Sequence, residues 1–344
     1  MIYLISPDKK QYKANLHSHS TMSDGYRTPN ELKEMYKSEG YSILAITDHE
    51  RPMQHQYLSD DDFIMITGYE GYVRTTADAS YDVYSKEIHL NFFARDPMNE
   101  KLICFNPSYS RYLIRDNVLD KTERVGSEKR REYCREYINE YIRTARENGY
   151  LVAYNHPYWS MEDEADILSY EGIFSVEMCN YGSYLSSGLE YNGALYDKIL
   201  RSGKKMFCHA ADDNHNAYPI DHVRSDSFGA FTMIIPEKFT YESVINAMEK
   251  GEMYSSMGPV FYEISVDGDR IHIECSDVSC IIVYTGSKVP CFLRAKEGDH
   301  ICSADFKIDE KASYLRISIQ DERGRWADTR GFFFEEMFGE QIEN

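Results

Sequence analysis

The chain has 344 residues, enough for one large domain or two ordinary ones, and 42% of them are hydrophobic, so a substantial core can form. Its 38 Lys and Arg against 57 Asp and Glu give a formal net charge of −19. That charge argues against a stable duplex nucleic-acid partner, because such binding depends on basic side chains that neutralise phosphates. A small anionic substrate is still allowed, since bound divalent cations reverse the local field.

Features that direct a chain to a membrane or an oxidising compartment are missing from the sequence. The N-terminal segment lacks a cationic start followed by a long apolar run, and there is no stretch of 18 apolar residues. The 8 cysteines form no Cys-x-x-Cys pair, and those near the C-terminus fit buried thiols better than a zinc site. We therefore expect a cytoplasmic protein with no membrane partner.

From the N-terminus to about residue 258, short apolar or β-branched runs alternate with helical segments. Such runs are typical of strands buried on both faces. The expected strands are Tyr12–His17, Ser42–Thr47, Phe63–Gly68, Ile88–Ala94, Leu151–Asn155, Ile173–Met178, Met206–Ala210 and Phe228–Ile235. A capping box with Pro at N1, Thr28-Pro29-Asn30-Glu31, starts a helix that ends near Gly40. Further helices are expected at Ser127–Asn148, Leu189–Ser202 and Thr240–Lys250.

This alternation favours an α/β fold with a parallel sheet or a (β/α) barrel. The Cys104–Lys121 segment fits neither pattern, so we expect an insertion over about 98–135. Arg130 and Arg131, on the helix expected from Ser127, stand among glutamates and are expected on a solvated, ion-paired face.

The sequence pattern changes after Pro259, where strand-like runs are separated by Asp-Gly, Thr-Gly and Arg-Gly turn signals. We expect a small all-β, sandwich-like domain over 259–336 that packs on the barrel or mediates self-association, followed by an acidic tail at 337–344. Its expected strands are Phe261–Val266, Arg270–Cys275, Ile281–Tyr284, Ala312–Gln320 and Phe332–Phe334.

Metal-type side chains recur at or near the ends of the expected strands. His17 and His19 are two apart, and on a strand such residues share one face. Asp24 follows in a Ser-Asp-Gly turn that can swing its carboxylate back toward them. The C-terminal strand ends of a (β/α) barrel carry its active site. The remaining candidates are Asp48, His49, Glu70, His89, His156, Asp213 and His215.

In this order the motifs resemble the polymerase-and-histidinol-phosphatase (PHP) superfamily, over roughly residues 12–258, and its metallo-phosphoesterases that carry a small β domain after Gly251–Pro259. The resemblance implies a distorted (β/α)7 barrel and two or three divalent ions, for which imidazole and carboxylate favour Zn, Mn or Fe. The implied metal ligands are His17, His19, Asp24, His49, Glu70, His89, His156, Asp213 and His215. Asp48 is implied either as a ligand or as a residue that orients His49 or a bridging water.

The last motif departs from the family pattern. Many relatives have Gly-Ser/Thr-Asp-x-His, whereas this chain has His209-Ala-Ala-Asp-Asp-Asn-His215, and the spacing favours Asp213 over Asp212 as the ligand. His209 is extra, and two roles are open for it: contact with the substrate, or filling of the barrel floor.

The resemblance implies hydrolysis by a metal-bridging hydroxide. Asp48 and the extra His209 are the candidate catalytic residues of this chain. For a small phosphorylated substrate, Arg27 and Arg224 are candidates to grip a phosphate, and Tyr158 and Trp159 to stack on a base or sugar. Ordinary surface or core roles are the alternative for all four.

The first hypothesis is a phosphoesterase that acts on a nucleotide or sugar phosphate. An alternative is a metallohydrolase of a non-phosphate ester, amide or carbamate, because a multinuclear site activates water against carbon as well as phosphorus. A nucleic-acid-binding or proofreading module ranks third, since the net charge disfavours it and the ligand set is complete.

Overall fold

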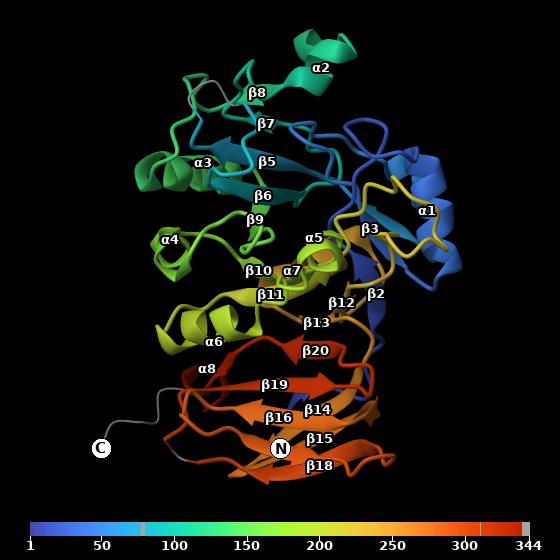
Figure 1. Ribbon diagram of the computed structural model, residues 1–344, viewed down its shortest axis with the longest axis vertical. Helices are drawn as coiled ribbons and strands as arrows, with labels where there is room; N and C mark the ends of the chain where they lie inside the picture. The colour runs from blue at the N-terminus through green and yellow to red at the C-terminus, as the bar shows by residue number, and fades with distance from the viewer. Residues whose placement is uncertain (77–79, 310, 339–344) are drawn as a thin grey trace.

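The computed structural model describes residues 1–76, 80–309 and 311–338 (Figure 1). Its strands are β1 (Ile2–Ile5), β2 (Tyr12–Asn15), β3 (Ile43–Ala45), β4 (Ile64–Ile66), β5 (Gly68–Arg74), β6 (Glu87–Ala94), β7 (Leu102–Ile103), β8 (Arg124–Val125), β9 (Tyr150–Tyr154), β10 (Ser175–Asn180), β11 (Phe207–Ala211), β12 (Phe231–Ile234), β13 (Met253–Ser256), β14 (Phe261–Asp267), β15 (Arg270–Val278), β16 (Cys280–Tyr284), β17 (Cys291–Arg294), β18 (Ile301–Lys307), β19 (Tyr314–Gln320), β20 (Trp326–Thr329) and β21 (Phe332–Phe333). Its α-helices are α1 (Pro29–Ser38), α2 (Arg111–Arg115), α3 (Arg135–Glu147), α4 (Glu164–Ser169), α5 (Tyr181–Ser187), α6 (Gly193–Arg201), α7 (Tyr241–Lys250) and α8 (Phe334–Phe338), and short 3-10 turns lie at Gln56–Leu58 and Leu119–Lys121.

The chain is a mixed α/β protein whose described strands pair into several sheets. The longest has the order β17-β16-β19-β20-β13-β12-β2-β3-β4, with β21 added on β19. A second has the order β11-β10-β9-β6-β5, and a third the order β1-β14-β15-β18. Strands β2 to β12, which include those followed by the predicted metal motifs, occupy the upper and middle parts of Figure 1. The C-terminal strands lie below them.

The parallel strands β2, β3 and β4 separate two layers of core. Side chains of β3 alternate between its faces, as strand geometry requires. Leu44 packs with Leu32 and Tyr36 of α1 on one face. Ile43 and Ala45 face the other way, toward α7 and the second sheet. Burial on both faces holds these strands in place and fixes the chain ends that leave them.

The predicted helices are present, with shifted starts. The capping box is confirmed: the Thr28 side chain accepts from the Glu31 amide, and the Glu31 side chain accepts from the Thr28 amide. Helix α7 ends as predicted at Gly251, which has a left-handed backbone. Helix α3 begins at Arg135 rather than at Ser127, and α6 begins after the predicted Leu189. Among the described helices, none combines the length and apolar character needed to cross a bilayer.

A closed (β/α)7 barrel is not formed by hydrogen-bonded strands in the described part of the chain. Strands β5 and β6 form an antiparallel hairpin, and β6 is also antiparallel to β9. A parallel pair needs a crossover of a dozen or more residues, usually a helix. The link from β5 to β6 contains no helix in its described residues. The α/β class is therefore observed, while the barrel expected from the sequence is interrupted at this hairpin.

The C-terminal strands enclose a core of their own. Ile264 and Ile273 of one sheet pack against Ile281 and Ile317 of the other. The N-terminal strand β1 pairs antiparallel with β14, so the start of the chain lies among these strands (Figure 1). Strands β13 and β20 pair across the predicted boundary at residue 258, which stays a prediction. The expected acidic tail at 337–344 begins inside α8, and residues 339–344 lie outside the described residues.

The predicted insertion at 98–135 contributes to the main core and is tied to it by a buried ion pair. Arg131 is only 3% exposed, and its guanidinium donates to both carboxylate oxygens of Glu50 and to the carbonyl oxygens of Tyr72 and Cys104. The solvated helix face predicted for Arg131 is therefore wrong, because the helix has not yet begun at this position. Arg130 is exposed, as expected.

We expect Arg131→Ala to lower the free energy of unfolding by about 3–5 kcal/mol, because it leaves the Glu50 carboxylate buried without its partner. Urea denaturation measures the change. Arg130→Ala is the matched control and should shift stability by less than about 0.5 kcal/mol. Equal effects of the two variants would contradict the importance of the pair.

Candidate metal centre

Backbone hydrogen bonds bring the first and last histidine motifs side by side. The His19 amide donates to the Asn214 carbonyl at 3.0 Å, and the Asp213 amide donates to the His17 carbonyl at 3.0 Å. Both imidazoles point to the same place, as their spacing predicts. The Nε2 atoms of His17 and His19 lie 3.1 and 3.0 Å from Oδ1 of Asp213.

Glu70, at the start of β5, lies in the middle of the histidines and is 1% exposed. Its carboxylate is the meeting point of imidazoles that come from separate strand ends. The distances to its oxygens are 2.9 Å from His49 Nδ1, 3.0 Å from His89 Nδ1, 3.2 Å from His17 Nε2, 3.4 Å from His156 Nε2 and 3.5 Å from His19 Nε2.

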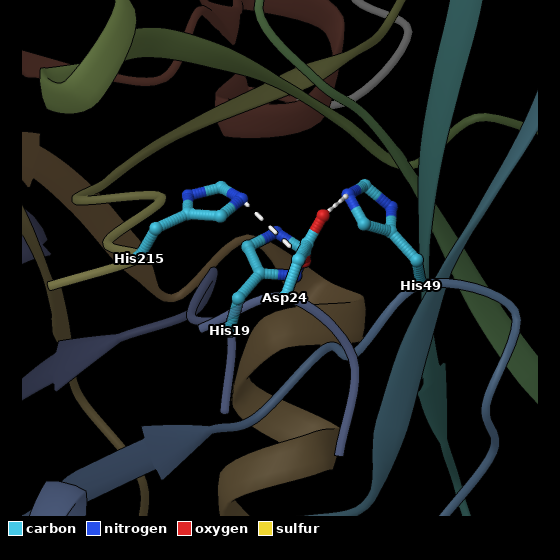
Figure 2. Close-up of side chains that lie close together, drawn as sticks. All are labelled: His19, Asp24, His49 and His215. Atoms are coloured by element: carbon cyan, nitrogen blue, oxygen red, sulfur yellow. Dashed lines mark ion pairs between the residues drawn. The ribbon is translucent and has the colours of Figure 1, made fainter. Parts of the chain in front are cut away.

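A second grouping forms around Asp24. Figure 2 shows its carboxylate between His49 and His215, with His19 beside it. The shortest distances from its oxygens to these rings are 3.6, 3.7 and 3.8 Å respectively. The Ser-Asp-Gly turn does swing the carboxylate back, and it needs glycine, because a Cβ at Gly25 would lie 2.1 Å from the His19 carbonyl oxygen.

The donor set fits divalent cations. Three overlapping groups of candidate ligand atoms each lie within 4.8 Å of one another in the described residues: His19 with Asp24, His49 and His215; His17 with His19 and Glu70; and His49 with Glu70 and His89. Buried polar atoms are nearly always hydrogen-bonded. Here, however, Oδ1 of Asp24, Nδ1 of His49, Nδ1 of His89 and Oδ1 of Asp213 are buried and make no hydrogen bond of suitable geometry, although charged partners of the centre lie within 4 Å of each. Imidazole and carboxylate ligands suit Zn, Mn or Fe.

The carboxylates and imidazoles of the centre shift one another's pKa values. Burial alone raises the pKa of Glu70, but His89 and its neighbouring imidazoles hold that pKa well below its usual value. Burial lowers the pKa of His17, yet Asp213 and Glu70 raise it well above the ordinary value. Burial and the adjacent imidazoles lower the pKa of His19 to about 4. The chain therefore places some imidazoles to carry positive charge and others to stay neutral when no cation is bound.

Two candidate ligands sit on an unusual backbone. His156 has φ 26° and Asp213 has φ 52°, in the left-handed region that non-glycine residues rarely adopt. Such conformations cost about 1–3 kcal/mol each and persist where the surroundings enforce them, most often at functional sites.

Glu177 of β10, a residue that the sequence analysis did not single out, supports several ligands from behind. It is 0% exposed. Its Oε1 lies 2.8 Å from Nδ1 of His17, and its Oε2 accepts from the His156 amide at 2.8 Å and from Asn180 Nδ2 at 2.9 Å. Asn180 Nδ2 also donates to Oδ2 of Asp213 at 3.0 Å. A carboxylate bonded to the outer nitrogen of a ligating imidazole fixes its tautomer and orientation.

The two predicted catalytic residues lie behind the ligands. Asp48 accepts from the Ser20 amide at 2.8 Å, from Ser20 Oγ at 2.6 Å and from Ser23 Oγ at 2.5 Å, so it holds the loop that carries Asp24. His209 is buried, with Nδ1 2.9 Å from Ser175 Oγ, and burial lowers its pKa to about 4. Neither residue lines the cleft described next, and for His209 this favours the filling role over substrate contact.

An open cleft of about 1030 Å³ leads to the centre. Of the predicted substrate residues, Arg224 and Trp159 line it. The Arg224 guanidinium lies 4.6 Å from the centre of the Tyr218 ring. Tyr158 faces an adjoining hollow instead, and Arg27 lies outside the cleft on the surface, 3.9 Å from Glu31.

Arg111, in helix α2 of the insertion, was not predicted from the sequence, yet it lines the cleft. Its Nη2 lies 3.6 Å from Oδ2 of Asp24. No motif marks it, because it comes from a segment with no regular pattern. Arg74 also lines the cleft, where its Nε donates to Glu87 at 2.5 Å.

No protein-family model and no curated protein matches the chain. Several solved structures are similar to it. A two-domain protein from Bacteroides vulgatus ATCC 8482, described as containing a predicted PHP-like metal-dependent phosphoesterase, is 12% identical with a TM-score of 0.44, over 92% of this chain and 91% of that one. A protein from Bifidobacterium adolescentis ATCC 15703, named as a metal-dependent phosphoesterase, is 16% identical with a TM-score of 0.35, over 59% of this chain and 87% of that one. An amidohydrolase from Chromobacterium violaceum, with bound sulfate and no metal, is 17% identical with a TM-score of 0.36, over 59% and 87% of the two chains.

We expect Glu177→Ala to weaken divalent-metal binding by about 10- to 100-fold, because His17 loses the acceptor that orients it. Titration with Mn²⁺ or Zn²⁺ against a competing chelator measures the affinity. Glu177→Gln, which keeps an acceptor oxygen, should recover part of the loss, and the exposed Glu171→Ala is the control. Wild-type affinity in a folded Glu177→Ala protein would contradict this role.

Proposed function

We propose that this protein is a multinuclear metal-dependent phosphoesterase that hydrolyses a small phosphoester of the nucleotide or sugar phosphate class. The observation that carries the proposal is the convergence of Glu70, Asp213 and Asp24 with histidines at the floor of an open cleft. The order of the motifs, which resembles the PHP superfamily, supports it. The proposed cofactors are two or three ions of Zn, Mn or Fe, held by His17, His19, Asp24, His49, Glu70, His89, His156, Asp213 and His215.

The residues of the chain divide the work between holding ions and holding substrate. When bound, the ions supply an activated water and neutralise developing negative charge. Glu177 orients the His17 imidazole and Asp48 fixes the loop of Asp24, so the ligands keep one arrangement. Arg111 and Arg224 line the same cleft and can donate to phosphoryl oxygens.

These two guanidiniums favour an anionic substrate over a neutral one. The chain as a whole carries a net charge of −19. Two guanidiniums in the cleft of so acidic a protein therefore indicate that the cleft binds a negatively charged group. A neutral amide or carboxylate ester gains little from them. Hydrolysis of a non-phosphate ester, amide or carbamate is therefore the second candidate. A nucleic-acid-binding or proofreading role ranks below both.

Free thiols support the reducing, cytoplasmic compartment expected from the sequence. The 8 cysteines are unpaired in the structure, and five of them are buried: Cys104, Cys179, Cys208, Cys275 and Cys280. Burial raises the pKa of the Cys208 thiol to about 12, which keeps it protonated and unreactive.

We expect the protein loaded with Mn²⁺ to release phosphate from a defined subset of nucleoside mono- and bisphosphates, sugar phosphates and histidinol phosphate. Asp213→Ala should lower kcat at least about 100-fold, because it removes a carboxylate shared by two histidines of the centre. Asp62→Ala, on an exposed loop, is the matched control. If the metal-loaded protein releases no phosphate from any substrate of the panel but hydrolyses carboxylate or carbamate esters, the second candidate function would replace the first.

A further inference from the structure

A second hollow, of about 670 Å³, adjoins the metal cleft. Trp159 and Tyr81 line both spaces, so the two adjoin at these residues. The lining changes character beyond them. Val83, Tyr158 and Met161 replace the histidines and carboxylates of the centre.

Large apolar side chains are exposed around this hollow. Tyr158 is 50% exposed, Met161 49% and Trp159 37%, and Tyr81 and Val83 are exposed on the facing segment. Single exposed apolar residues are ordinary, but a group of them beside a cleft marks a binding surface. Their position at the edge of a polar centre indicates a ligand with one charged end and one apolar end.

The turn that presents Tyr158 and Trp159 is rigidly built. Glu190, 0% exposed, accepts from the Tyr158 amide at 3.0 Å and from the Trp159 amide at 2.8 Å. Asn192 Nδ2 donates to the same carboxylate at 2.9 Å. Burying a carboxylate is costly unless it is hydrogen-bonded. Here its bonds fix a short backbone turn whose side chains stay open to solvent, which is the arrangement of a preorganised binding surface.

Trp159 connects the hollow directly to the metal centre. Its ring lies 5.0 Å from the ring of His89 and 4.8 Å from that of His156, measured between centroids. A phosphoryl group placed at the candidate ligands therefore has its leaving group within reach of Trp159 and the apolar wall beyond it.

The charged residues of the hollow argue against a second phosphate. No Lys or Arg belongs to its described lining, whose charged members are Asp82, Glu87 and Glu162. Glu87 is bonded to Arg74, and Glu162 accepts the hydroxyls of three tyrosines, so these two are satisfied within the protein. A neutral, planar group suits such a surface, because aromatic side chains offer it stacking faces.

We propose that this hollow binds the planar aromatic part of the alcohol that leaves when the phosphoester is hydrolysed, either the base of a nucleoside or a simple aryl group. The proposal rests on the proposed phosphoesterase function and narrows its substrate class to aromatic phosphoesters. Sugar phosphates without an aromatic group would leave the wall of Tyr158 and Met161 uncovered.

Steady-state kinetics with three substrates test it: adenosine 5′-monophosphate, ribose 5-phosphate, which lacks only the base, and benzyl phosphate, whose leaving group is an alkoxide like those of the other two. We expect kcat/KM for at least one aromatic ester to exceed that for ribose 5-phosphate by about tenfold or more. Tyr158→Ala and Met161→Ala, which do not contact the candidate ligands, should reduce that preference severalfold. Tyr262→Ala, an exposed tyrosine of β14, should keep it. Which aromatic ester is preferred separates nucleobase from aryl. Equal efficiency on all three substrates, or a preference that neither variant changes, would overturn the proposal.

A binding measurement separates failure of this site from failure of the enzyme assignment. The chain has 2 tryptophans, so Trp326→Phe leaves Trp159 as the sole indole reporter. We expect saturable quenching of its fluorescence by adenosine or benzyl alcohol, none by ribose, and weaker quenching when Tyr158→Ala is added. Quenching without phosphatase activity would retain the aromatic site and overturn the phosphoesterase. Phosphatase activity without quenching by either aromatic compound would do the reverse.

Discussion

Several carboxylates are buried close together, and the need to pair their negative charges constrains much of the fold. Glu70 and Asp213 are ionised groups in a low-dielectric interior, where an unpaired carboxylate is prohibitively costly. Five histidines lie within 3.5 Å of the Glu70 oxygens among the described residues, and they arrive from the ends of β2, β3 and β9 and from β6. Moving any of these strands leaves a carboxylate or an imidazole without its partner. The packing of α1, α3 and α7 on the sheets therefore also holds the electrostatic balance of the centre.

Around the candidate ligands lies a shell of polar groups, several of which hydrogen-bond to one another. Glu177 joins His17 to the His156 backbone and, through Asn180, to Asp213. The next layer reaches the insertion, because Glu50 directly follows His49 in the chain and pairs with Arg131. The segment that supplies Arg111 to the cleft is thus anchored, through the ion pair of Arg131, to the residue next to a candidate ligand. A segment that departs from the regular pattern is in this way made part of the site.

The features predicted from sequence are those with a local signal. The pair His17 and His19 was recognisable because a spacing of two on a strand has one geometric meaning, and the helix start at Thr28 because its capping box is self-contained. The missed features depend on contacts between distant segments. The pairing of β1 with β14 joins positions more than 250 residues apart, and no periodicity records it. Glu177 shows in the sequence only as one carboxylate within a run expected to be a buried strand. Arg27 was chosen for its closeness to a motif in sequence, whereas Arg111 is the arginine that lies close in space.

In the proposed phosphoesterase, the negative charge of the centre couples the binding of metal ions to the binding of the phosphate. Without cations, charged imidazoles such as His17 balance part of the charge of the buried carboxylates, while the overall charge of −19 still opposes the approach of a phosphate. The guanidiniums of Arg111 and Arg224 offset part of that charge along the cleft. Each divalent ion held by the candidate ligands would add two positive charges at the floor of the cleft and so favour an anion there. In the proposed phosphoesterase, metal binding and substrate binding would therefore stabilise each other, and by linkage a phosphate held in the cleft would tighten the binding of the ions beneath it. An acidic protein can in this way be selective for an anion, because the attraction exists only where the histidines and carboxylates have gathered the metal.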